Sequence, residues 1–156
     1  MAFDRAKAHL VHYQFADRIQ VFEVSSATVE LAAAALRTDP HRIAKTLAFR
    51  DGETYLLVVT AGDGKIDNAK FKAAFGMKAR MLDPQDTDVL VGHAVGGVCP
   101  FGVHPGGRIV LDVSMKRFRT VFPAVGSSNS AVELSLQELE VAAQTTTWVD
   151  VCKDWE

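Results

Sequence analysis

The chain has 156 residues, of which 48% are hydrophobic and 23% are charged, and its formal net charge is -2. This balance is typical of a folded protein, so we expect a single domain over residues 1–156 and exclude both a disordered chain and a strongly basic nucleic-acid-binding protein. The start of the chain lacks the apolar run of a signal peptide, and no window approaches the roughly 20 apolar residues that cross a bilayer. We therefore expect a cytoplasmic protein that does not enter membranes.

Patterns typical of helices and of strands follow one another without a regular repeat. Helices are expected over residues 3–13, 28–36, 66–75, 84–91 and 136–144. Strands are expected over residues 19–24, 43–50, 54–60, 108–113, 121–125, 131–134 and 148–152. The tight-turn pair Asp51-Gly52 predicts a hairpin between the second and third of these strands. The mixture predicts an α+β domain, because a Rossmann domain needs a glycine-rich turn directly after its first strand.

Three of the expected helices carry signals at their ends. Thr28 is placed to cap the second helix, and Gly76 is placed to end the third. Ser135 is followed three residues later by Glu138, which is the sequence pattern of a capping box at the start of the last helix. These signals support the expected boundaries of the three helices.

Basic residues are concentrated in one short stretch of the chain. Residues 1–119 contain 16 basic and 13 acidic residues, whereas residues 120–156 contain one basic and six acidic residues. Between Lys65 and Arg80, five basic residues accompany Asp67 as the single acid. Two interpretations stay open: a patch that faces phosphate groups, or an ordinary solvated helix face.

Two features indicate a ligand site. Residues 92–107 contain six of the eleven glycines, and Gly96 and Gly97 there precede the sequence Val98-Cys99-Pro100. Glycines let the backbone approach a ligand closely, and its N–H groups can hold a carbonyl oxygen. Lys45 lies inside an apolar expected strand, where it is either a surface lysine with a buried stem or a cation directed into a cleft.

Conventional catalytic motifs are missing from the sequence, which contains no metalloprotease, serine-hydrolase or nucleotide-loop signature. His9 and His12 lie three residues apart on an expected helix, but no third ligand accompanies them, so we expect neither a metal nor another cofactor. Cys99, with His93 and His104 nearby in sequence, is either a thiolate nucleophile or a small side chain in a tight loop. Its distance in sequence from Cys152 favours reduced thiols over a disulfide.

The order of several short motifs resembles the YbaK/ProX family, which includes the editing domain of bacterial prolyl-tRNA synthetases and its free-standing relatives. The resemblance runs from about residue 24 to residue 151 and rests on TVELAAAAL, IAKTLAF, LLVVTAGDGKID, VGHAVGGVCPFG and RIVLDVSM. It implies a mixed, barrel-like sheet with helices packed around it. Val91 and Cys99 depart from the common pattern, in which Thr and Ser are frequent at these positions.

The resemblance also implies a set of site residues. Lys45 matches the lysine of the family's K-T-L motif and is the expected catalytic residue, with its ammonium facing the backbone of residues 96–100 across a cleft. The expected substrate-binding residues are Thr46, Gly96, Gly97, Val98, Cys99, Pro100, Asp112 and Gly126. In the basic stretch, the residues expected to bind tRNA are Lys65, Lys70 and Lys72.

By resemblance, the protein hydrolyses the ester of mischarged aminoacyl-tRNA, most often tRNA for proline carrying a small non-cognate amino acid. The implied mechanism is substrate-assisted: Lys45 and the loop of residues 96–100 position the ester, and a water attacks with help from the adjacent ribose hydroxyl. The implied partners are the acceptor end of aminoacyl-tRNA and prolyl-tRNA synthetase. Two alternatives stay open, namely a non-catalytic module that binds the acceptor end or a synthetase, and a hydrolase that acts through Cys99.

Overall fold

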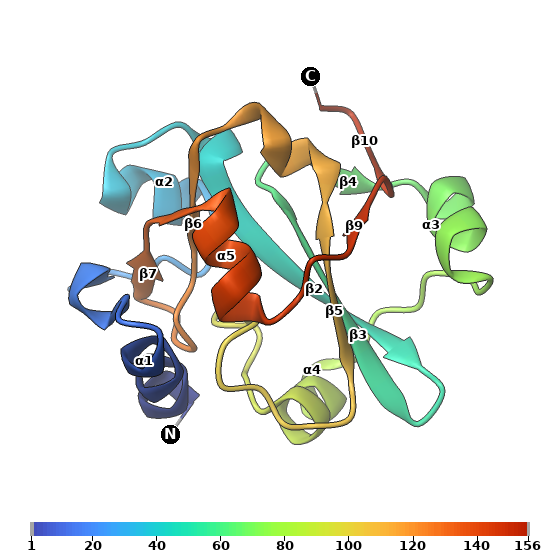
Figure 1. Ribbon diagram of the computed structural model, residues 1–156, viewed down its shortest axis with the longest axis horizontal. Coiled ribbons are helices and arrows are strands. Elements are labelled where there is room, and N and C mark those ends of the chain that lie inside the picture. The colour runs from blue at the N-terminus through green and yellow to red at the C-terminus, as the bar shows by residue number, and fades with distance from the viewer. Residues whose placement is uncertain (1, 156) are drawn as a thin grey trace.

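A computed structural model describes residues 2–155, which form a curled mixed sheet surrounded by helices (Figure 1). The sheet has six strands in the order β8-β6-β2-β3-β5-β9. In chain order these strands are β2 (Ile43–Asp51), β3 (Thr54–Ala61), β5 (Arg108–Asp112), β6 (Thr120–Pro123), β8 (Leu134–Ser135) and β9 (Trp148–Val149). Two separate pairs consist of β1 (Ile19–Val21) with β7 (Ser130–Val132), and of β4 (Lys65–Ile66) with β10 (Cys152–Lys153).

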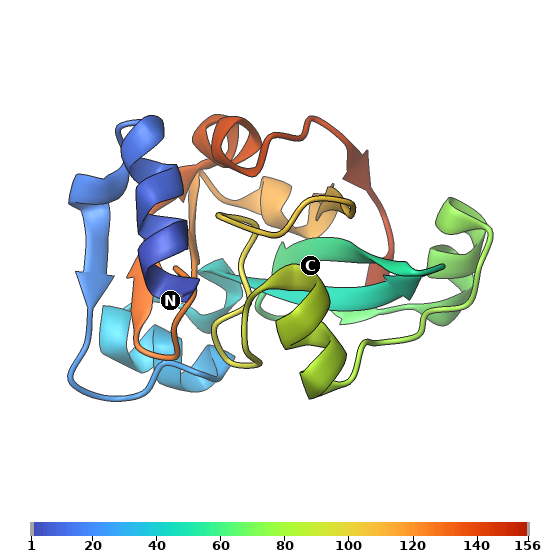
Figure 2. The ribbon, with the colours of Figure 1, turned by 90° about the horizontal axis from the view of Figure 1, so that it is seen from below.

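The helices lie around this sheet and at the two ends of the molecule. The α-helices are α1 (Ala2–His12), α2 (Val29–Leu36), α3 (Asn68–Phe75), α4 (Pro84–Asp86) and α5 (Leu136–Ala143). A π-helical turn at Thr87–Val91 continues α4, and short 3-10 turns lie at Ala16–Arg18, Pro40–Arg42 and Val113–Arg117. Figures 1 and 2 place α1 and α3 at opposite ends of the molecule. Among residues 2–155, no helix has the length and apolar character needed to span a bilayer.

The long hairpin of β2 and β3 is the centre of the sheet. Its strands are antiparallel and pair from Ala44 with Ala61 to Asp51 with Thr54, and β5 then adds to β3 in parallel. Side chains alternate along β2: Ala44 and Ala48 pack toward one face, whereas Leu47 and Phe49 pack with the cluster around Phe71 on the other face. The two faces of β2 therefore belong to different parts of the core.

One edge of β2 is only partly paired, and this gap positions the site. The parallel strand β6 pairs with β2 at Ile43 and Ala44 alone. Farther along, the chain around Met81 takes over the edge: Met81 forms an antiparallel bridge with Phe49, and the Leu82 N–H donates to the Ala48 carbonyl over 3.0 Å. Between these two contacts, residues 45–47 of β2 have no neighbouring strand on this side.

The α+β prediction with a mixed, barrel-like sheet is confirmed, and so are the helix-end signals. Thr28 and Ser135 cap α2 and α5, the latter through a complete capping box with Glu138, and Gly76 ends α3 in a left-handed conformation with φ of 69°. The hairpin predicted at Asp51-Gly52 is also present.

Several expected elements are shorter than the sequence pattern suggested, because local contacts interrupt them. The expected helix over 66–75 begins at Asn68, since Ile66 pairs with Cys152 in a strand and the Asp67 carboxylate caps the helix. The expected strand over 148–152 is split, because the Val151 N–H donates to a side chain, that of Asp112, over 2.9 Å. The expected strand over 131–134 is split where the chain passes from β1 to β6.

Candidate functional site

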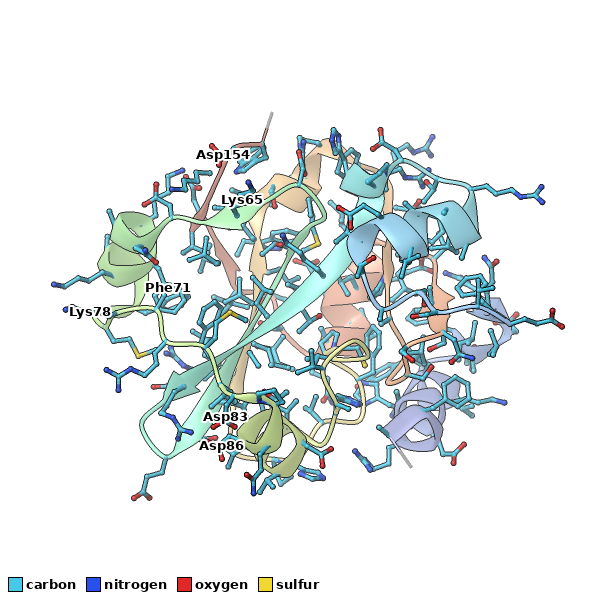
Figure 3. All side chains as sticks on the ribbon, turned by 180° about the vertical axis from the view of Figure 1, so that it is seen from behind. Lys65, Phe71, Lys78, Asp83, Asp86 and Asp154 are labelled. Atoms are coloured by element: carbon cyan, nitrogen blue, oxygen red, sulfur yellow. The ribbon has the colours of Figure 1, made fainter. Side chains whose placement is uncertain are left out.

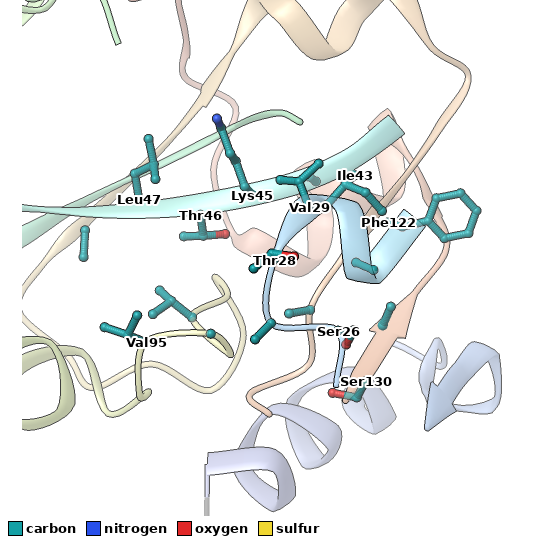
Figure 4. A pocket seen from close by; sticks show the side chains of 18 of the residues that line it. Ser26, Thr28, Val29, Ile43, Lys45, Thr46, Leu47, Val95, Phe122 and Ser130 are labelled. Atoms are coloured by element: carbon teal, nitrogen blue, oxygen red, sulfur yellow. The ribbon is translucent and has the colours of Figure 1, made fainter. Parts of the chain in front are cut away.

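A cavity of about 270 Å³ opens beside the partly paired edge of β2 (Figure 4). It lies between β2, the segment before α2, the segment at Met81 and the glycine-rich loop. Small side chains create its volume, since six alanines line it: Ala27, Ala32, Ala44, Ala48, Ala124 and Ala131. The polar side chains in the wall are Ser26, Thr28, Lys45, Thr46, Thr87 and Ser130. Lys45 is thus the one charged side chain among the described lining residues. The volume is at the small end of ligand cavities, which suits a small group.

Lys45 contributes an amine that has no hydrogen-bond or ion-pair partner within residues 2–155. Burial lowers the pKa of Lys45, and the nearby charges of Asp63 and Glu30 oppose that shift while Lys65 adds to it. A half-buried cation without a partner is costly for the fold, so the amine is expected to bind an external anion or dipole.

The prediction that the Lys45 ammonium faces the backbone of residues 96–100 across a cleft is wrong. Figure 4 shows its amine on the side of β2 away from Val95, because successive side chains of a strand point to opposite faces. Lys45, Gly96 and Val98 still line one cavity, so the structure brings the strand and the loop together. A ligand that binds both would therefore contact the Lys45 amine on one side of the β2 edge and the loop on the other side.

Thr46, the next residue, lies on the opposite face of β2 from Lys45. Its hydroxyl oxygen is buried and has no hydrogen-bond partner within residues 2–155. Leaving a buried hydroxyl unpaired costs roughly 1–3 kcal/mol. The cavity therefore offers an unused donor and acceptor beside the glycine-rich loop.

The glycine-rich loop reaches the cavity at Gly96 and Val98. Gly96 has a φ of 98°, which disfavours other residues, and Gly97 packs so closely that an added Cβ would lie 2.7 Å from the Ser127 backbone nitrogen. The N–H groups of Gly96 and Val98 have no hydrogen-bond partner in the described part of the chain, whereas that of Gly97 donates to the Ala94 carbonyl. Two residues that line the cavity thus carry backbone donors without a partner, and such donors can bind a carbonyl oxygen.

The other end of the loop is held by α1. Arg5 donates through its guanidinium to the carbonyls of Gly92 and, over 3.4 Å, Gly102. Gly102 and Gly126 both have positive φ and pack against the backbone of α1, at Arg5 and Ala2 respectively. Gly126, expected to bind substrate, therefore does not line the cavity and instead allows close packing of α1.

Cys99 and His93 form a pair in the interior, away from the cavity. The Cys99 sulfur lies 3.5 Å from His93 Nε2 and 3.6 Å from the Phe101 carbonyl, and neither side chain is exposed. Burial raises the pKa of Cys99 to about 12, while burial lowers the pKa of His93. The thiol therefore stays protonated at neutral pH, which argues against a hydrolase acting through Cys99.

We expect the variant Cys99→Ser to keep its hydrolytic activity, within about twofold of the wild-type protein, because a hydroxyl can donate to the Phe101 carbonyl as the thiol does. The measurement is the rate of ester hydrolysis by both proteins at equal concentration. A loss on the order of a hundredfold would instead assign the chemistry to the thiol.

Asp112 and Pro100, two more of the expected substrate-binding residues, are buried outside the cavity lining. The Asp112 carboxylate accepts hydrogen bonds from the Ser114 and Val151 N–H groups, each over 2.9 Å. These bonds start the 3-10 turn after β5 and hold the C-terminal segment against the sheet. In this structure Asp112 has a structural role.

The three lysines expected to bind tRNA lie at the α3 end of the molecule. Lys70 is engaged with Asp150 over 3.1 Å and with the Cys152 carbonyl over 3.0 Å. Lys65 is exposed on β4, opposite Lys153 of β10, and Lys72 is exposed on α3. At the other end of the molecule, His9 donates through Nε2 to the Ala142 carbonyl. Residues 2–155 contain no cluster of three or more metal-ligating side chains.

Several lining residues were not expected from the sequence. Ser26 is distant in sequence from Phe122 and Ser130, and the three residues meet only in the fold. None of the three carries a local signal, because a serine or phenylalanine in a short strand or loop is ordinary. Only the pairing of β6 with the start of β2 brings Phe122 to the cavity.

Comparison with known proteins places the chain in a family. The family model described as "Aminoacyl-tRNA editing domain" matches residues 23–141, which include the whole cavity lining. The uncharacterized protein YwhH of Bacillus subtilis (strain 168) is 48% identical, with full coverage of both chains. A proline–tRNA ligase of Geobacillus sp. (strain WCH70) is 30% identical over 57% of this chain, which corresponds to 16% of the ligase.

Solved structures show the same fold. A crystal structure described as a candidate trans-editing enzyme for prolyl tRNA synthetase superposes with a TM-score of 0.87 at 23% identity, covering 97% of both chains. A structure of a hypothetical protein superposes with a TM-score of 0.81 at 27% identity, covering 93% of this chain and 99% of the other. The family match over most of the chain, together with this fold, shows that the protein belongs to the aminoacyl-tRNA editing domain family.

Proposed function

We propose that this protein is a free-standing deacylase that hydrolyses the ester between a mischarged amino acid and its tRNA. The observation that carries the proposal is the cavity itself: it is a small apolar volume whose walls hold one unpartnered hydroxyl and two residues with unpartnered backbone donors, and an unpartnered amine extends from the same strand on its other face. No cysteine, histidine, aspartate or glutamate is among the residues described as lining it. Such a site is suited to positioning a reactive ester rather than attacking it.

Each part of the cavity has a role in this proposal. The small alanine-lined volume takes the amino-acid side chain, and the N–H groups of Gly96 and Val98 hold the ester carbonyl oxygen. The amine of Lys45, on the other side of the β2 edge, binds a phosphate of the terminal nucleotide. Thr46 donates to the ribose or to the ester from the wall.

The reaction is a hydrolysis assisted by the substrate. A water attacks the ester carbonyl carbon, and the negative charge that develops on the carbonyl oxygen is stabilised by the loop N–H groups. The bond between the carbonyl carbon and the ribose oxygen then breaks. The ribose hydroxyl beside the ester relays the water's proton to that oxygen, which yields a free amino acid and an uncharged tRNA.

The expected substrate is tRNA for proline that carries a small non-cognate amino acid. The cavity volume of about 270 Å³ supports a small side chain. The similarity to part of a proline–tRNA ligase, and to the structure described for prolyl tRNA synthetase, supports the choice of tRNA and makes a prolyl-tRNA synthetase the proposed partner. We propose that the whole chain acts as one editing domain in the cytoplasm.

A panel of tRNAs for proline, each charged with alanine, serine, cysteine, valine or proline, tests this function. We expect the wild-type protein to remove the small non-cognate amino acids at least about a hundredfold faster than buffer does and to spare proline. Ester loss at the buffer rate for every amino acid would contradict the proposal. Binding of the charged tRNA without turnover would support the alternative, a non-catalytic module.

A further inference from the structure

A second surface, lined by basic side chains, begins where the cavity ends. It consists of two neighbouring hollows that share Lys78: one is lined by residues of α3, Lys72 among them, and the other by Arg50 and Arg80. We call the surface formed by Arg50, Lys72, Lys78 and Arg80 the basic groove. Every charged side chain that lines the two hollows is basic.

The basic groove lies next to the cavity, because consecutive residues of the chain line the two. Met81 is 59% exposed and lines the cavity, and the preceding residue, Arg80, lines the groove. The Arg80 carbonyl accepts the Arg50 N–H over 2.8 Å, so this segment is fixed along the edge of β2. Figure 3 shows Lys78 at the outer end of the segment that leads to Asp83 at the start of α4. Five extended residues, 78–82, span at most roughly 17 Å.

The acids near the groove have partners, except for the exposed Glu53 next to Gly52. Asp51 pairs with Arg108 over 3.0 Å, Asp150 pairs with Lys70 over 3.1 Å, and Asp86 pairs with Arg50. Asp67 and Asp83 accept backbone N–H groups at the starts of α3 and α4. By contrast, Lys72, Lys78 and Arg80 are exposed, and their side chains make no hydrogen bond or ion pair within residues 2–155.

We propose that the basic groove binds the phosphate backbone of the acceptor stem of the tRNA whose charged 3′ end occupies the cavity. This inference rests on the proposed function and names the part of the substrate that the cavity is too small to hold. Exposed, unpartnered lysine and arginine side chains neutralise phosphates and supply affinity that does not depend on base sequence. The groove also differs from the three lysines expected from the sequence, since Lys70 is engaged and Lys78 and Arg80 take its place.

The test compares two substrates that carry the same ester. One is the full mischarged tRNA, and the other is the same amino acid esterified to the trinucleotide CCA, which lacks the acceptor stem. The variant K78A/R80A removes two charges and keeps the Arg80 carbonyl that holds the segment. The control variant K7A/R119A also removes two exposed charges, from α1 and from the segment before β6, where neither side chain has a partner in the described chain.

For K78A/R80A we expect kcat/KM on the full tRNA to fall about tenfold or more. We also expect the plot of log kcat/KM against log salt concentration to become less steep, by the slope of about two phosphate contacts. On the CCA substrate we expect the wild-type value, and we expect K7A/R119A to match the wild-type protein on both substrates. Unchanged kcat/KM on the full tRNA, or an equal fall on both substrates, would overturn the inference.

Affinity for uncharged tRNA, measured by fluorescence anisotropy, separates this inference from the proposed function. We expect K78A/R80A to bind about tenfold more weakly than the wild-type protein and K7A/R119A to bind equally well. Equal affinity for all three proteins would refute the groove even if the wild-type protein hydrolyses the ester. Absence of hydrolysis by the wild-type protein, with the expected loss of affinity in K78A/R80A, would refute the deacylase and leave the groove supported.

Discussion

Replacement of Lys45 by methionine is expected to lower kcat/KM for deacylation by about 10- to 100-fold while leaving the fold intact. Lys45 is the one charged residue in the described cavity lining, and its amine has no partner within residues 2–155, so its interaction with substrate phosphate is lost without exposing a buried counter-ion. A charge-assisted hydrogen bond contributes roughly 1.5–3 kcal/mol, which corresponds to this range. The measurement is deacylation of the best substrate of the panel by wild-type, Lys45→Met and Lys45→Arg proteins.

Lys7→Met is the matched control, because Lys7 is an exposed lysine on α1 outside the cavity lining. We expect this control to have the wild-type rate and Lys45→Arg to recover part of the activity, since a guanidinium also binds phosphate. Wild-type activity in Lys45→Met would contradict the role that we assign to the amine.

Stability distinguishes this loss of function from damage to the fold. Burial lowers the pKa of Lys45 below its usual 10.5, so the unfolded chain holds the proton more tightly than the folded protein. The charged amine therefore destabilises the fold at neutral pH, and this cost disappears as pH rises from the folded pKa to the unfolded value. Lys45→Met should be at least as stable as the wild-type protein at pH 7, as measured by urea unfolding.

Much of the fold is predictable from local sequence patterns. The β2–β3 hairpin follows from Asp51-Gly52 between two apolar runs, and the caps at Thr28 and Ser135 fix the starts of α2 and α5. The short strands near the C-terminus are less predictable, because a carboxylate, that of Asp112, replaces strand pairing at Val151. Side-chain contacts of this kind depend on residues distant in sequence and leave no periodic pattern.

The candidate site is predictable in part, for related reasons. Lys45 and Gly96 are recognisable from the family motifs, and the structure places both at the cavity. Gly97, Gly126 and Asp112 are recognisable from the same motifs, yet they act on backbone packing, which a motif cannot distinguish from ligand binding. The alanines of the wall carry no signal, since an alanine that leaves space for a ligand looks like any other alanine.

Deacylation is also expected to depend on the substrate's own ribose hydroxyl, because the described lining residues include no conventional general base. Removing a group that transfers a proton in the transition state lowers a rate by roughly 10²- to 10⁴-fold. Replacing this hydroxyl by hydrogen leaves the amino acid, the phosphates and the ester in place. Binding to the cavity should therefore change little.

The most direct measurement uses a tRNA that ends in 2′-deoxyadenosine and carries the preferred amino acid on its 3′ oxygen. Single-turnover rates at saturating protein are compared with those of the normal tRNA, after correction for ester loss in buffer. We predict a fall of at least about a hundredfold with little change in affinity. An unchanged rate would show that the protein itself supplies the proton transfer, and would contradict a cavity that only positions the ester.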